Sequence, residues 1–432
     1  CLIYILQNDY KFKMKKFLLT IFLLFLLSAT LFLFIDYEKK INVQKSFIKI
    51  YEFITFKEKK YINLEKKIDK NLLTSKFDKL KINLIKLNKR DFDRPLGYLE
   101  TIKKNIIYLG ANGDLLLIDD NFLKNEIKSN LKSYFNNEIK KEELFTPFSV
   151  NPVRDLLYHD GFLYVVIVDI SIINSEINYS TSVLKGKFNS DYINFKYFFR
   201  PNSFVKEKKD FSNPIDLTHS GGRIVVDKDN NFFIAVPDYD QKDKIQNKDN
   251  IFGKILEIKS LTDYKIISIG HRNPQGFYYD KEKNFFIESE HGPSGGDEIN
   301  LIKQNKNYGW PIVSTGVGDE NITKFHNHKK LGYNSPLYSW SIWNPGISQI
   351  IKIKKKSKFK FRDLYIVGSL SGHNRFYGNH LYIFDIDENK AILKDKIFIG
   401  DRVRDLIYDK INDRIILAVE NQEAIAIIDL LE

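Results

Sequence analysis

The sequence predicts an all-β protein, a six-bladed β-propeller that follows an N-terminal transmembrane helix and a Lys-rich, helical stalk. From about residue 95, short apolar runs alternate with polar turns that contain Asp, Asn or Gly, as in strand–turn–strand hairpins. One hairpin recurs, because RDLLYHDGFLYV at 154–165 resembles RDLIYDKINDRIILAV at 404–419. Asp227 and Asp280 occupy matching turns 53 residues apart, which suits a blade of four short strands. Residues 95–432 then hold roughly six blades; a β-sandwich is the alternative, but it does not need this repetition.

The N-terminal part contains an apolar segment. Residues 17–35 are 19 uncharged, mostly apolar positions, which is enough to cross a bilayer core, and four lysines precede them. The positive-inside rule predicts a membrane anchor at 14–36, in the cell inner membrane, with the propeller facing the periplasm or exterior. A cleaved signal peptide at the same residues, giving a secreted or periplasmic protein, is the open alternative. We interpret residues 1–13, before the only methionine, as the product of a misplaced gene start.

Residues 37–94 are interpreted as a basic stalk, because apolar residues at three- and four-residue spacings favour a helix. A solvated spacer explains the same composition. Residues 1–90 hold 20 Lys and Arg against 8 Asp and Glu, so they carry the whole net charge of +12. Residues 91–432 are formally neutral, so no nucleic-acid partner is expected, and the membrane is the predicted partner of the N-terminal helix. The single cysteine, Cys1, excludes an intrachain disulfide and a thiolate metal cluster.

Chemically versatile residues gather in loops between the predicted strands. His219 comes before a strand and Asp238 follows the next one, so a hairpin would bring both to the same end. A carboxylate there can orient an imidazole as a general base, although a lone loop histidine is more often a surface residue. The motif GHRNPQG at 270–276 adds Arg272 and Asn273, a planar cation and an amide that suit a carboxylate or quinone oxygen. A salt-bridged turn is the simpler interpretation of that pair.

A second loop, EHGPSGGDE at 290–298, is rich in glycine and acid. The glycines let the backbone turn carbonyl groups inward, and Asp297 and Glu298 supply negative charge. Such oxygen atoms suit a hard cation such as Ca²⁺, and a tight acidic turn is the alternative.

Near the C-terminus, Arg402 and Arg404 lie two residues apart, which places them on one face of a regular strand. Two guanidiniums on one face repel each other unless an anion lies between them. Bridging by Asp401 and Asp405 is the simplest answer, and a bound anionic ligand is the other.

These motifs resemble, in their order along the chain, the glucose/sorbosone dehydrogenase family, the soluble quinoprotein sugar dehydrogenases. The resemblance covers residues 200–432 well. Over residues 95–200 it is limited to the alternation of short apolar runs with polar turns. The segments that carry it are HSGGR (219–223), DNIFGKILEI (249–258), GHRNPQG (270–276), EHGPSGGDEINLI (290–302), NYGWP (307–311) and RVRD (402–405).

The resemblance implies a propeller that binds pyrroloquinoline quinone (PQQ) with Ca²⁺ at one axial end and oxidises an aldose at its anomeric carbon. His219 matches the general base that takes the sugar's hydroxyl proton as hydride moves to the quinone, and Asp238 matches the carboxylate that orients it. The positions that match cofactor contacts are Arg272, Asn273, Asp297, Arg402 and Arg404. The positions that match Ca²⁺ ligands are the carbonyls of Gly292 and Pro293 and, for a further ion in some relatives, Glu298 and the backbone of Tyr308.

Some segments depart from the family pattern. The loop SWSIWNPGIS at 339–348 diverges, and a lysine that contacts the cofactor in the glucose dehydrogenases is missing near Ser371. Trp343 of this loop is a candidate substrate contact that could stack on a sugar, or a filler between blades. These departures keep open a second hypothesis, a catalytically inactive propeller that recognises a glycan or a protein partner. The enzyme hypothesis implies a small sugar substrate and an electron acceptor of unknown identity.

Overall fold

The computed structural model describes residues 80–87, 97–135, 152–206, 219–293, 295–316, 328–340, 344–360, 362–370 and 378–430. All of them belong to one compact unit, Lys60–Glu432. The expected start-site segment at 1–13, the expected anchor at 14–36, most of the expected stalk and Trp343 lie outside the described residues.

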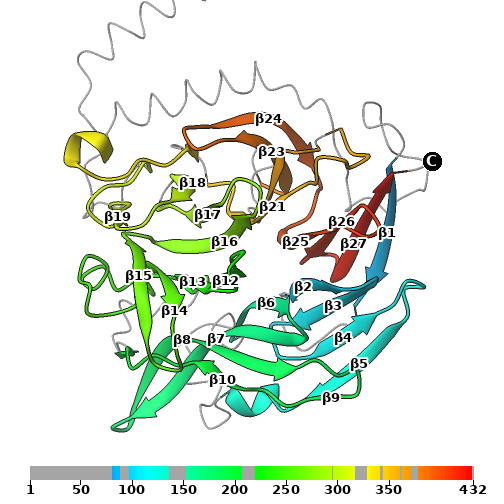
Figure 1. Cartoon of the computed structure of the whole chain (residues 1–432), viewed down its shortest axis with the longest axis horizontal. Coiled ribbons are helices and arrows are strands. Elements are labelled where there is room, and N and C mark those ends of the chain that lie inside the picture. Colours follow the sequence, from blue (N-terminus) through cyan, green and yellow to red (C-terminus); the bar gives the residue numbers. More distant parts are fainter. Residues whose placement is uncertain are drawn as a thin grey trace, which may run out of the picture. The chain divides into compact units, whose positions relative to one another are not determined.

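Six sheets are arranged like blades around a common axis (Figure 1), which confirms the predicted all-β, six-bladed propeller. Neighbouring strands pair mainly in the antiparallel sense. The first sheet consists of β2 (Gly97–Ile102), β3 (Asn105–Gly110), β4 (Leu115–Ile118), β5 (Lys124–Ser129) and β9 (Tyr192–Ile193). The second consists of β6 (Val153–His159), β7 (Phe162–Ile173), β8 (Glu176–Lys187), β10 (Lys196–Phe199) and β11 (Val205–Lys206). The third consists of β12 (Arg223–Val226), β13 (Phe232–Val236), β14 (Lys254–Ile258), β15 (Tyr264–Ile269) and β19 (Lys306–Asn307).

The other three sheets have four strands each. The fourth sheet consists of β16 (Asn273–Asp280), β17 (Phe285–His291), β18 (Asp297–Ile302) and β20 (Tyr338–Trp340). The fifth consists of β21 (Ile347–Lys352), β22 (Tyr365–Ser369), β23 (His380–Ile386) and β24 (Ala391–Phe398). The sixth consists of β25 (Val403–Asp409), β26 (Arg414–Val419), β27 (Ala424–Leu430) and β1 (Leu80–Lys86). Among the described residues, two short 3₁₀ helices, η1 (Leu131–Tyr134) and η4 (His328–Leu331), lie in connections between strands.

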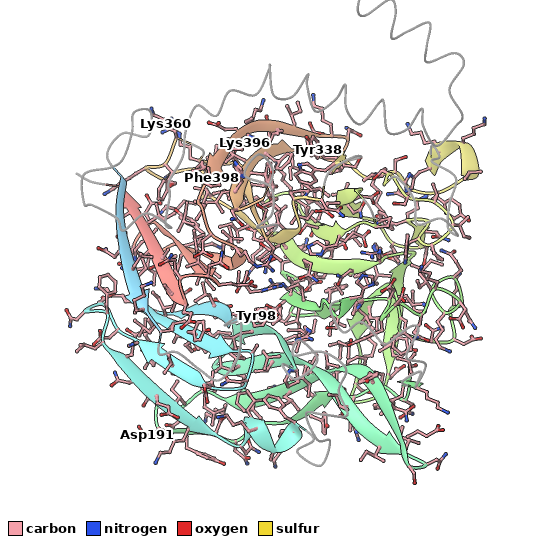
Figure 2. The ribbon with its side chains drawn as sticks, turned by 180° about the vertical axis from the view of Figure 1, so that it is seen from behind. Tyr98, Asp191, Tyr338, Lys360, Lys396 and Phe398 are labelled. Carbon is pink, nitrogen blue, oxygen red and sulfur yellow. The ribbon has the colours of Figure 1, made fainter. Side chains whose placement is uncertain are left out.

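The innermost strands form a closed ring. These strands are β2, β6, β12, β16, β21 and β25. Each of them contacts the next, and β25 contacts β2. The blades pack against one another through apolar side chains; one buried cluster, for example, joins Ile299 and Trp340 of the fourth sheet to Val367 and Phe384 of the fifth. Figure 2 shows Tyr98 of β2 near the centre of the ring, whereas Asp191 lies at its outer edge.

The turn between the first and second strands of a blade is built in the same way in three blades. Asp227, Asp280 and Asp409 each accept a hydrogen bond from the backbone N–H two residues further on, over 2.8 to 3.0 Å. An aspartate that bonds its own backbone in this way favours a turn over continued strand. The matching turns seen in the sequence are therefore structurally equivalent.

Strand β1 closes the ring from the N-terminal side. It pairs antiparallel with β27, from Leu80 opposite Leu430 to Lys86 opposite Ala424. The propeller therefore includes residues that the sequence assigned to a helical stalk ending at 94. The segment LKINL at 80–84 also alternates apolar and polar side chains, which is the strand pattern, and β1 covers the otherwise free edge of β27.

The expected anchoring in the inner membrane is corrected, since the structure gives it no support. No helix among the described residues is long and apolar enough to cross a bilayer.

One buried arginine connects the inner strands near the axis. Nη1 of Arg223 on β12 lies 2.8 Å from Oδ1 of Asp155 on β6 and 2.9 Å from Oδ1 of Asp405 on β25. Its Nε donates to the carbonyl of Gln275 on β16 over 2.7 Å. Asp405 in turn accepts the backbone N–H of Leu99 on β2 over 2.8 Å. Five of the six inner strands are thereby joined through one side chain and its partners.

We expect Arg223→Ala to lower the free energy of unfolding by about 3–5 kcal/mol, because it leaves two buried carboxylates without their cation. Chemical denaturation of the full chain measures this loss. Lys394→Ala is the matched control: Lys394 pairs with Asp385 over 3.3 Å, but these side chains are 44% and 51% exposed, whereas that of Arg223 is 3% exposed. The control should lose about 1 kcal/mol or less. An equal loss in both variants would contradict the structural role of Arg223.

Candidate functional site

A repeated irregularity lies at the beginning of four inner strands. The pairing of β6, β16, β21 and β25 with the second strand of each blade shifts by one residue, which is a β-bulge. In three of these strands the extra residue is Arg154, Gln275 or Arg404. A bulge changes the direction in which a side chain points. Because these bulges lie at the beginning of the inner strands, the three polar residues share one end of the ring with the candidate residues that precede the strands.

His219, Asp238 and Arg272 meet at this end, as the hairpin argument predicted for the first two. His219 precedes β12, and its Nδ1 lies 3.8 Å from Oδ1 of Asp238, which follows β13. Its Nε2 lies 2.8 Å from Nη2 of Arg272. The guanidinium can only donate, so Nε2 accepts and a neutral His219 carries its proton on Nδ1. That Nδ1 is buried and has no hydrogen-bond partner among the described residues.

The imidazole of His219 is held in its neutral form. Burial and the positive charge of Arg272 place the pKa of His219 well below 6.5, with smaller contributions from His291 and Lys242. The ring is therefore able to accept a proton. Its environment is more electropositive than the sequence pattern alone indicated.

Asp238 is buried and held from three sides. It accepts hydrogen bonds from the backbone N–H of Asp240 over 2.9 Å and from the indole of Trp310 over 2.8 Å, and its own N–H donates to the carbonyl of Arg272. Burial raises the pKa of Asp238 to about 6, despite the opposing effect of Arg272. Trp310 therefore positions the carboxylate that faces His219, and its ring also lies 5.3 Å from the Arg272 guanidinium.

Asn273 links two inner strands at this end. Its Oδ1 accepts from the backbone N–H of Gly221 and from Nε2 of Gln275, each over 2.9 Å. Gly221 allows no side chain here, since a Cβ atom would lie 1.9 Å from the carbonyl oxygen of Pro274. Gln275 continues the polar chain to Arg404, whose Nη1 lies 3.4 Å from Oε1 of Gln275.

Arg402 and Arg404 converge on a single carboxylate, Glu420. Nε of Arg404 donates to Glu420 over 2.6 Å, and Nε of Arg402 donates to its other oxygen. Arg402 also donates to the carbonyl of Leu370. Burial raises the pKa of Glu420, but the two guanidinium charges outweigh burial and keep the carboxyl ionised below its usual range.

The expectation that Asp401 and Asp405 bridge the arginines is therefore corrected. Within the described chain, Asp401 accepts backbone N–H groups, including that of Arg402, and Asp405 pairs with Arg223. The regular alternation assumed for Arg402 and Arg404 does not hold either, because Arg404 is the extra residue of a bulge. Glu420 can offset only one of the two guanidinium charges.

The loop at 290–298 is held by Asp297. Its carboxylate accepts backbone N–H groups of Gly292 over 3.1 Å, Gly346 over 2.8 Å and Ile347 over 3.1 Å. Burial nevertheless raises the pKa of Asp297 to about 7. The carbonyl of Gly292 accepts from Arg272 over 2.9 Å, and that of Pro293 accepts from Asn344 over 2.6 Å.

Glu298 and Tyr308 lie in the same part of the molecule. Glu298 accepts from the hydroxyl of Thr315 over 2.7 Å. Burial raises its pKa to about 8, and the negative charge of nearby Glu290 adds to this shift. The hydroxyl of Tyr308 donates to the carbonyl of Leu301.

The described groups fit an anionic cofactor with an attached cation. Nε of Arg272 is buried and has no partner among the described residues, and the pair of arginines at 402 and 404 carries more positive charge than Glu420 cancels. A ligand with several carboxylates matches this excess. Each carbonyl oxygen has two lone pairs, so those of Gly292 and Pro293 can each accept one hydrogen bond and still ligate a cation.

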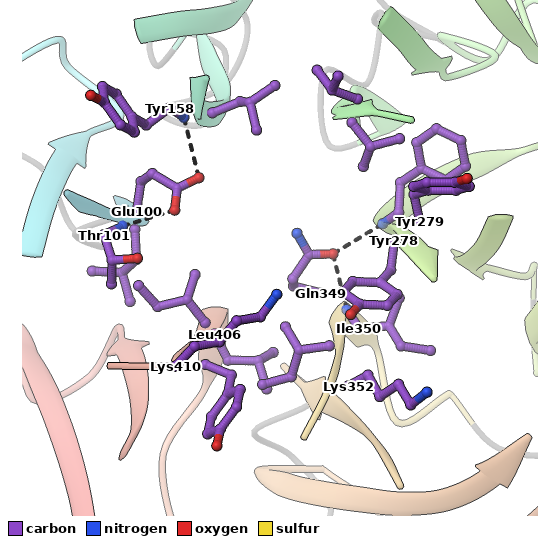
Figure 3. Close-up of a pocket in the computed structure, with 18 of the residues that line it drawn as sticks. Glu100, Thr101, Tyr158, Tyr278, Tyr279, Gln349, Ile350, Lys352, Leu406 and Lys410 are labelled. Atoms are coloured by element: carbon purple, nitrogen blue, oxygen red, sulfur yellow. Dashed lines mark hydrogen bonds between the residues drawn. The ribbon is translucent and has the colours of Figure 1, made fainter. Parts of the chain in front are cut away.

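A separate cavity of about 460 Å³ occupies the opposite end of the ring. It is lined by the second halves of the inner strands, and Figure 3 shows Glu100, Tyr158, Gln349, Lys352 and Lys410 around it. None of the candidate catalytic, cofactor or metal residues within the described chain lines this cavity. Its position therefore does not identify the predicted site.

Sequence reasoning missed Glu420, Trp310 and Arg154. Glu420 directly follows β26, the second strand of its blade, and Asp238 likewise comes shortly after β13, the second strand of its own blade. A carboxylate just after the second strand was therefore a sequence signal that could have identified Glu420. Trp310 lies within the motif NYGWP, and Arg154 opens the repeated RDL segment. Arg154 donates to Ser220, beside His219, over 2.8 Å.

Comparison with known proteins gives a consistent result. The family model for glucose/sorbosone dehydrogenase matches residues 159–428. Aldose sugar dehydrogenase YliI of Escherichia coli (strain K12) is 27% identical over 209 residues, which are 44% of this chain and 54% of the relative. Quinoprotein glucose dehydrogenase B of Acinetobacter calcoaceticus is 26% identical over 168 residues, 30% of this chain and 35% of the relative. The aligned part thus spans about half or less of each relative.

Solved structures share the fold. The soluble aldose sugar dehydrogenase of E. coli, in its apo form, has a TM-score of 0.62 at 18% identity and covers 82% of this chain and 100% of its own. The PQQ-bound aldose sugar dehydrogenase of Streptomyces coelicolor has a TM-score of 0.55 at 15% identity and covers 82% and 98%. Because the family model matches more than half of the sequence, this chain belongs to the glucose/sorbosone dehydrogenase family.

Proposed function

We propose that this protein is an aldose dehydrogenase that oxidises a sugar at its anomeric carbon, with PQQ as hydride acceptor and Ca²⁺ beside it. The observation that carries the proposal is the partly buried, neutral His219 between Asp238 and Arg272, at the same end of the ring as Arg402 and Arg404. The dehydrogenase activity named for the family and its relatives supports it. The hypothesis of an inactive binding module is not favoured by these relatives.

Binding of the cofactor is assigned to cationic and amide groups. Arg272, Arg402 and Arg404 would hold its carboxylates and quinone oxygens by charge-assisted hydrogen bonds, and Asn273 would add an amide contact. Asp297 holds the loop from which the carbonyls of Gly292 and Pro293 would ligate the associated Ca²⁺. Glu298 and the backbone of Tyr308 are proposed to hold a further Ca²⁺, since a cation would relieve the buried negative charge of Glu298.

Catalysis by the chain itself is assigned to His219. Its Nε2 would take the proton of the sugar's anomeric hydroxyl once the substrate replaces Arg272 as its partner. Asp238 would stabilise the resulting imidazolium through Nδ1–H, and Trp310 keeps that carboxylate in place. When bound, the quinone supplies the hydride acceptor and Ca²⁺ supplies Lewis acidity.

The proposal is tested by adding PQQ and Ca²⁺ to the purified full chain. The full chain is required because a fragment starting at residue 95 would lack β1. We expect a change in the absorbance of PQQ on binding and reduction of a redox dye when an aldose is supplied from a panel. An absorbance change without turnover on any aldose would contradict the enzymatic proposal, and the lack of any change would contradict cofactor binding as well.

Arg404→Gln should weaken PQQ binding by roughly 10- to 100-fold, because it removes a charge-assisted hydrogen bond. Titration of the absorbance change measures the dissociation constant. Arg414→Gln is the matched control, since Arg414 pairs with Asp409 and Asp120 away from the candidate site. Equal affinity in the wild type and Arg404→Gln would exclude Arg404 as a cofactor contact.

His219→Ala should keep PQQ binding and lower the rate by roughly 10²-fold or more, because it removes the general base. Single-turnover reduction with saturating sugar separates this loss from weaker binding. His159→Gln serves as the control, since His159 lines the cavity at the opposite end of the ring. Unchanged turnover in His219→Ala would rule out its role as the base.

The rate should fall as the pH decreases through about 6, where Asp238 takes up a proton and can no longer stabilise the imidazolium form of His219. In Asp238→Asn this titration is absent. The acid limb should then move to lower pH, where His219 itself is protonated, and the plateau should fall about tenfold. Profiles of kcat/KM against pH provide the test. An acid limb at the same pH in both proteins would show that Asp238 does not control it.

A further inference from the structure

Three side chains next to the candidate site form a second cluster, which the proposed function does not use. His271 precedes β16, and Glu288 and Glu290 lie on β17; we refer to them as the His–Glu cluster. His271 and Glu288 are 0% exposed, and Glu290 is 4% exposed. One potential ligand atom from each of the three lies within 4.8 Å of the others.

The distances within the cluster suit a shared ion better than hydrogen bonds. Nδ1 of His271 lies 3.6 Å from Oε2 of Glu288 and 3.8 Å from Oε1 of Glu290. A hydrogen bond from imidazole to carboxylate is about 2.7–2.9 Å long. Two ligands about 2.1 Å from one ion lie roughly 3.4–3.8 Å apart at angles near tetrahedral or somewhat wider.

The other ring nitrogen of His271 has a partner, and Nδ1 has none. Nε2 lies 2.8 Å from the hydroxyl of Ser268. Nδ1 is buried and without a hydrogen-bond partner among the described residues, although it faces two carboxylates. Histidines that ligate metals usually fix one ring nitrogen by such a hydrogen bond, which leaves the lone pair of the other for the ion.

The carboxylates of the cluster are oriented as well. Nδ2 of Asn300 donates to Oε2 of Glu288 over 3.1 Å and to Oε1 of Glu290 over 3.0 Å. The ring of Tyr308 packs over His271, with ring centroids 4.6 Å apart. These neighbours hold the three candidate ligand atoms toward one another and cover them from solvent.

Beside a neutral imidazole, two ionised carboxylates carry more negative charge than the described neighbours of the cluster neutralise. The guanidinium of Arg272 is directed to His219, His291 and Gly292, and only its backbone N–H reaches Glu290, over 2.6 Å. Burial raises the pKa of Glu288 to about 7, and the charge of Glu290 adds to this shift. A divalent cation would balance both carboxylates beside a neutral imidazole.

We propose that His271, Glu288 and Glu290 bind a zinc ion. One imidazole nitrogen and two carboxylate oxygens are ligands that Zn²⁺ accepts, whereas Ca²⁺ and Mg²⁺ prefer oxygen alone. The site shares no ligand with the positions proposed for Ca²⁺ at Gly292 and Pro293 or at Glu298 and Tyr308. The ion would fix the loop that carries Arg272, since His271 precedes Arg272 and Glu290 accepts its N–H.

The alternative is an imidazolium ion between the carboxylates. Burial lowers the pKa of His271, but Glu288 and Glu290 outweigh it and raise the value to about 9. A proton would then occupy the place assigned to zinc. The two possibilities differ in metal content and in the response of stability to a chelator, and neither measurement needs PQQ or a sugar.

The test starts with the purified full chain, stripped of metal with dipicolinate and then dialysed against Zn²⁺. Elemental mass spectrometry should find about one zinc ion per chain. At a free zinc concentration of about 100 times Kd, the unfolding temperature should rise by roughly 4 °C above that of the stripped chain. Mg²⁺ at the same concentration should not reproduce the rise when Zn²⁺ is absent.

Variants locate the ion. Glu288→Gln should lose the zinc and the stabilisation by zinc. Glu100→Gln should keep both: it is a matched control, because burial also raises the pKa of Glu100 to about 7, yet Glu100 lies at the opposite end of the ring. Glu298→Gln should also retain zinc, which separates this site from the proposed Ca²⁺ site.

Two results would overturn the proposal. One is a wild-type chain that retains no zinc and whose unfolding temperature responds to neither zinc nor dipicolinate, which would identify the cluster as an imidazolium bridge. The other is zinc that persists in Glu288→Gln and is lost in Glu298→Gln. If Glu288→Gln does not fold, the wild-type measurements alone decide.

Discussion

The propeller depends on one buried cation, Arg223, at the place where the blades converge. Its guanidinium is shared between Asp155 and Asp405, and its Nε holds the backbone of Gln275. Burying one positive and two negative groups costs much of the free energy that their attraction returns. We therefore infer that this network chiefly fixes the positions of five of the six inner strands relative to one another.

The candidate site follows from that alignment. Because the inner strands are held in register, bulges at equivalent positions bring Arg154, Gln275 and Arg404 to the same end of the ring. The loops that precede β12 and β16 add His219 and Arg272 there. The functional groups come from at least four blades, and none of these blades could assemble the site alone.

Much of this arrangement was predictable from local sequence patterns. The period of the hairpins predicted the blades, and the positions of His219 and Asp238 around one hairpin predicted that they meet. Contacts between blades were harder to predict, since they depend on packing rather than on spacing along the chain. Glu420 is the clearest case. Alternation predicted that Arg402 and Arg404 share one face, with Asp401 and Asp405 as the simplest bridge, but a bulge changes the alternation and the partner comes from the end of β26.

The same limit explains why β1 was assigned to a stalk, because its lysines and apolar residues indicate a strand only once β27 is available as a partner. This pairing also has a consequence for biosynthesis. During translation, β1 leaves the ribosome early and must wait for β27, which is made more than 330 residues later. The final sheet, and with it the closed ring, can therefore form only near the end of synthesis, so the nascent chain has to keep its first strand from pairing with other partners until then.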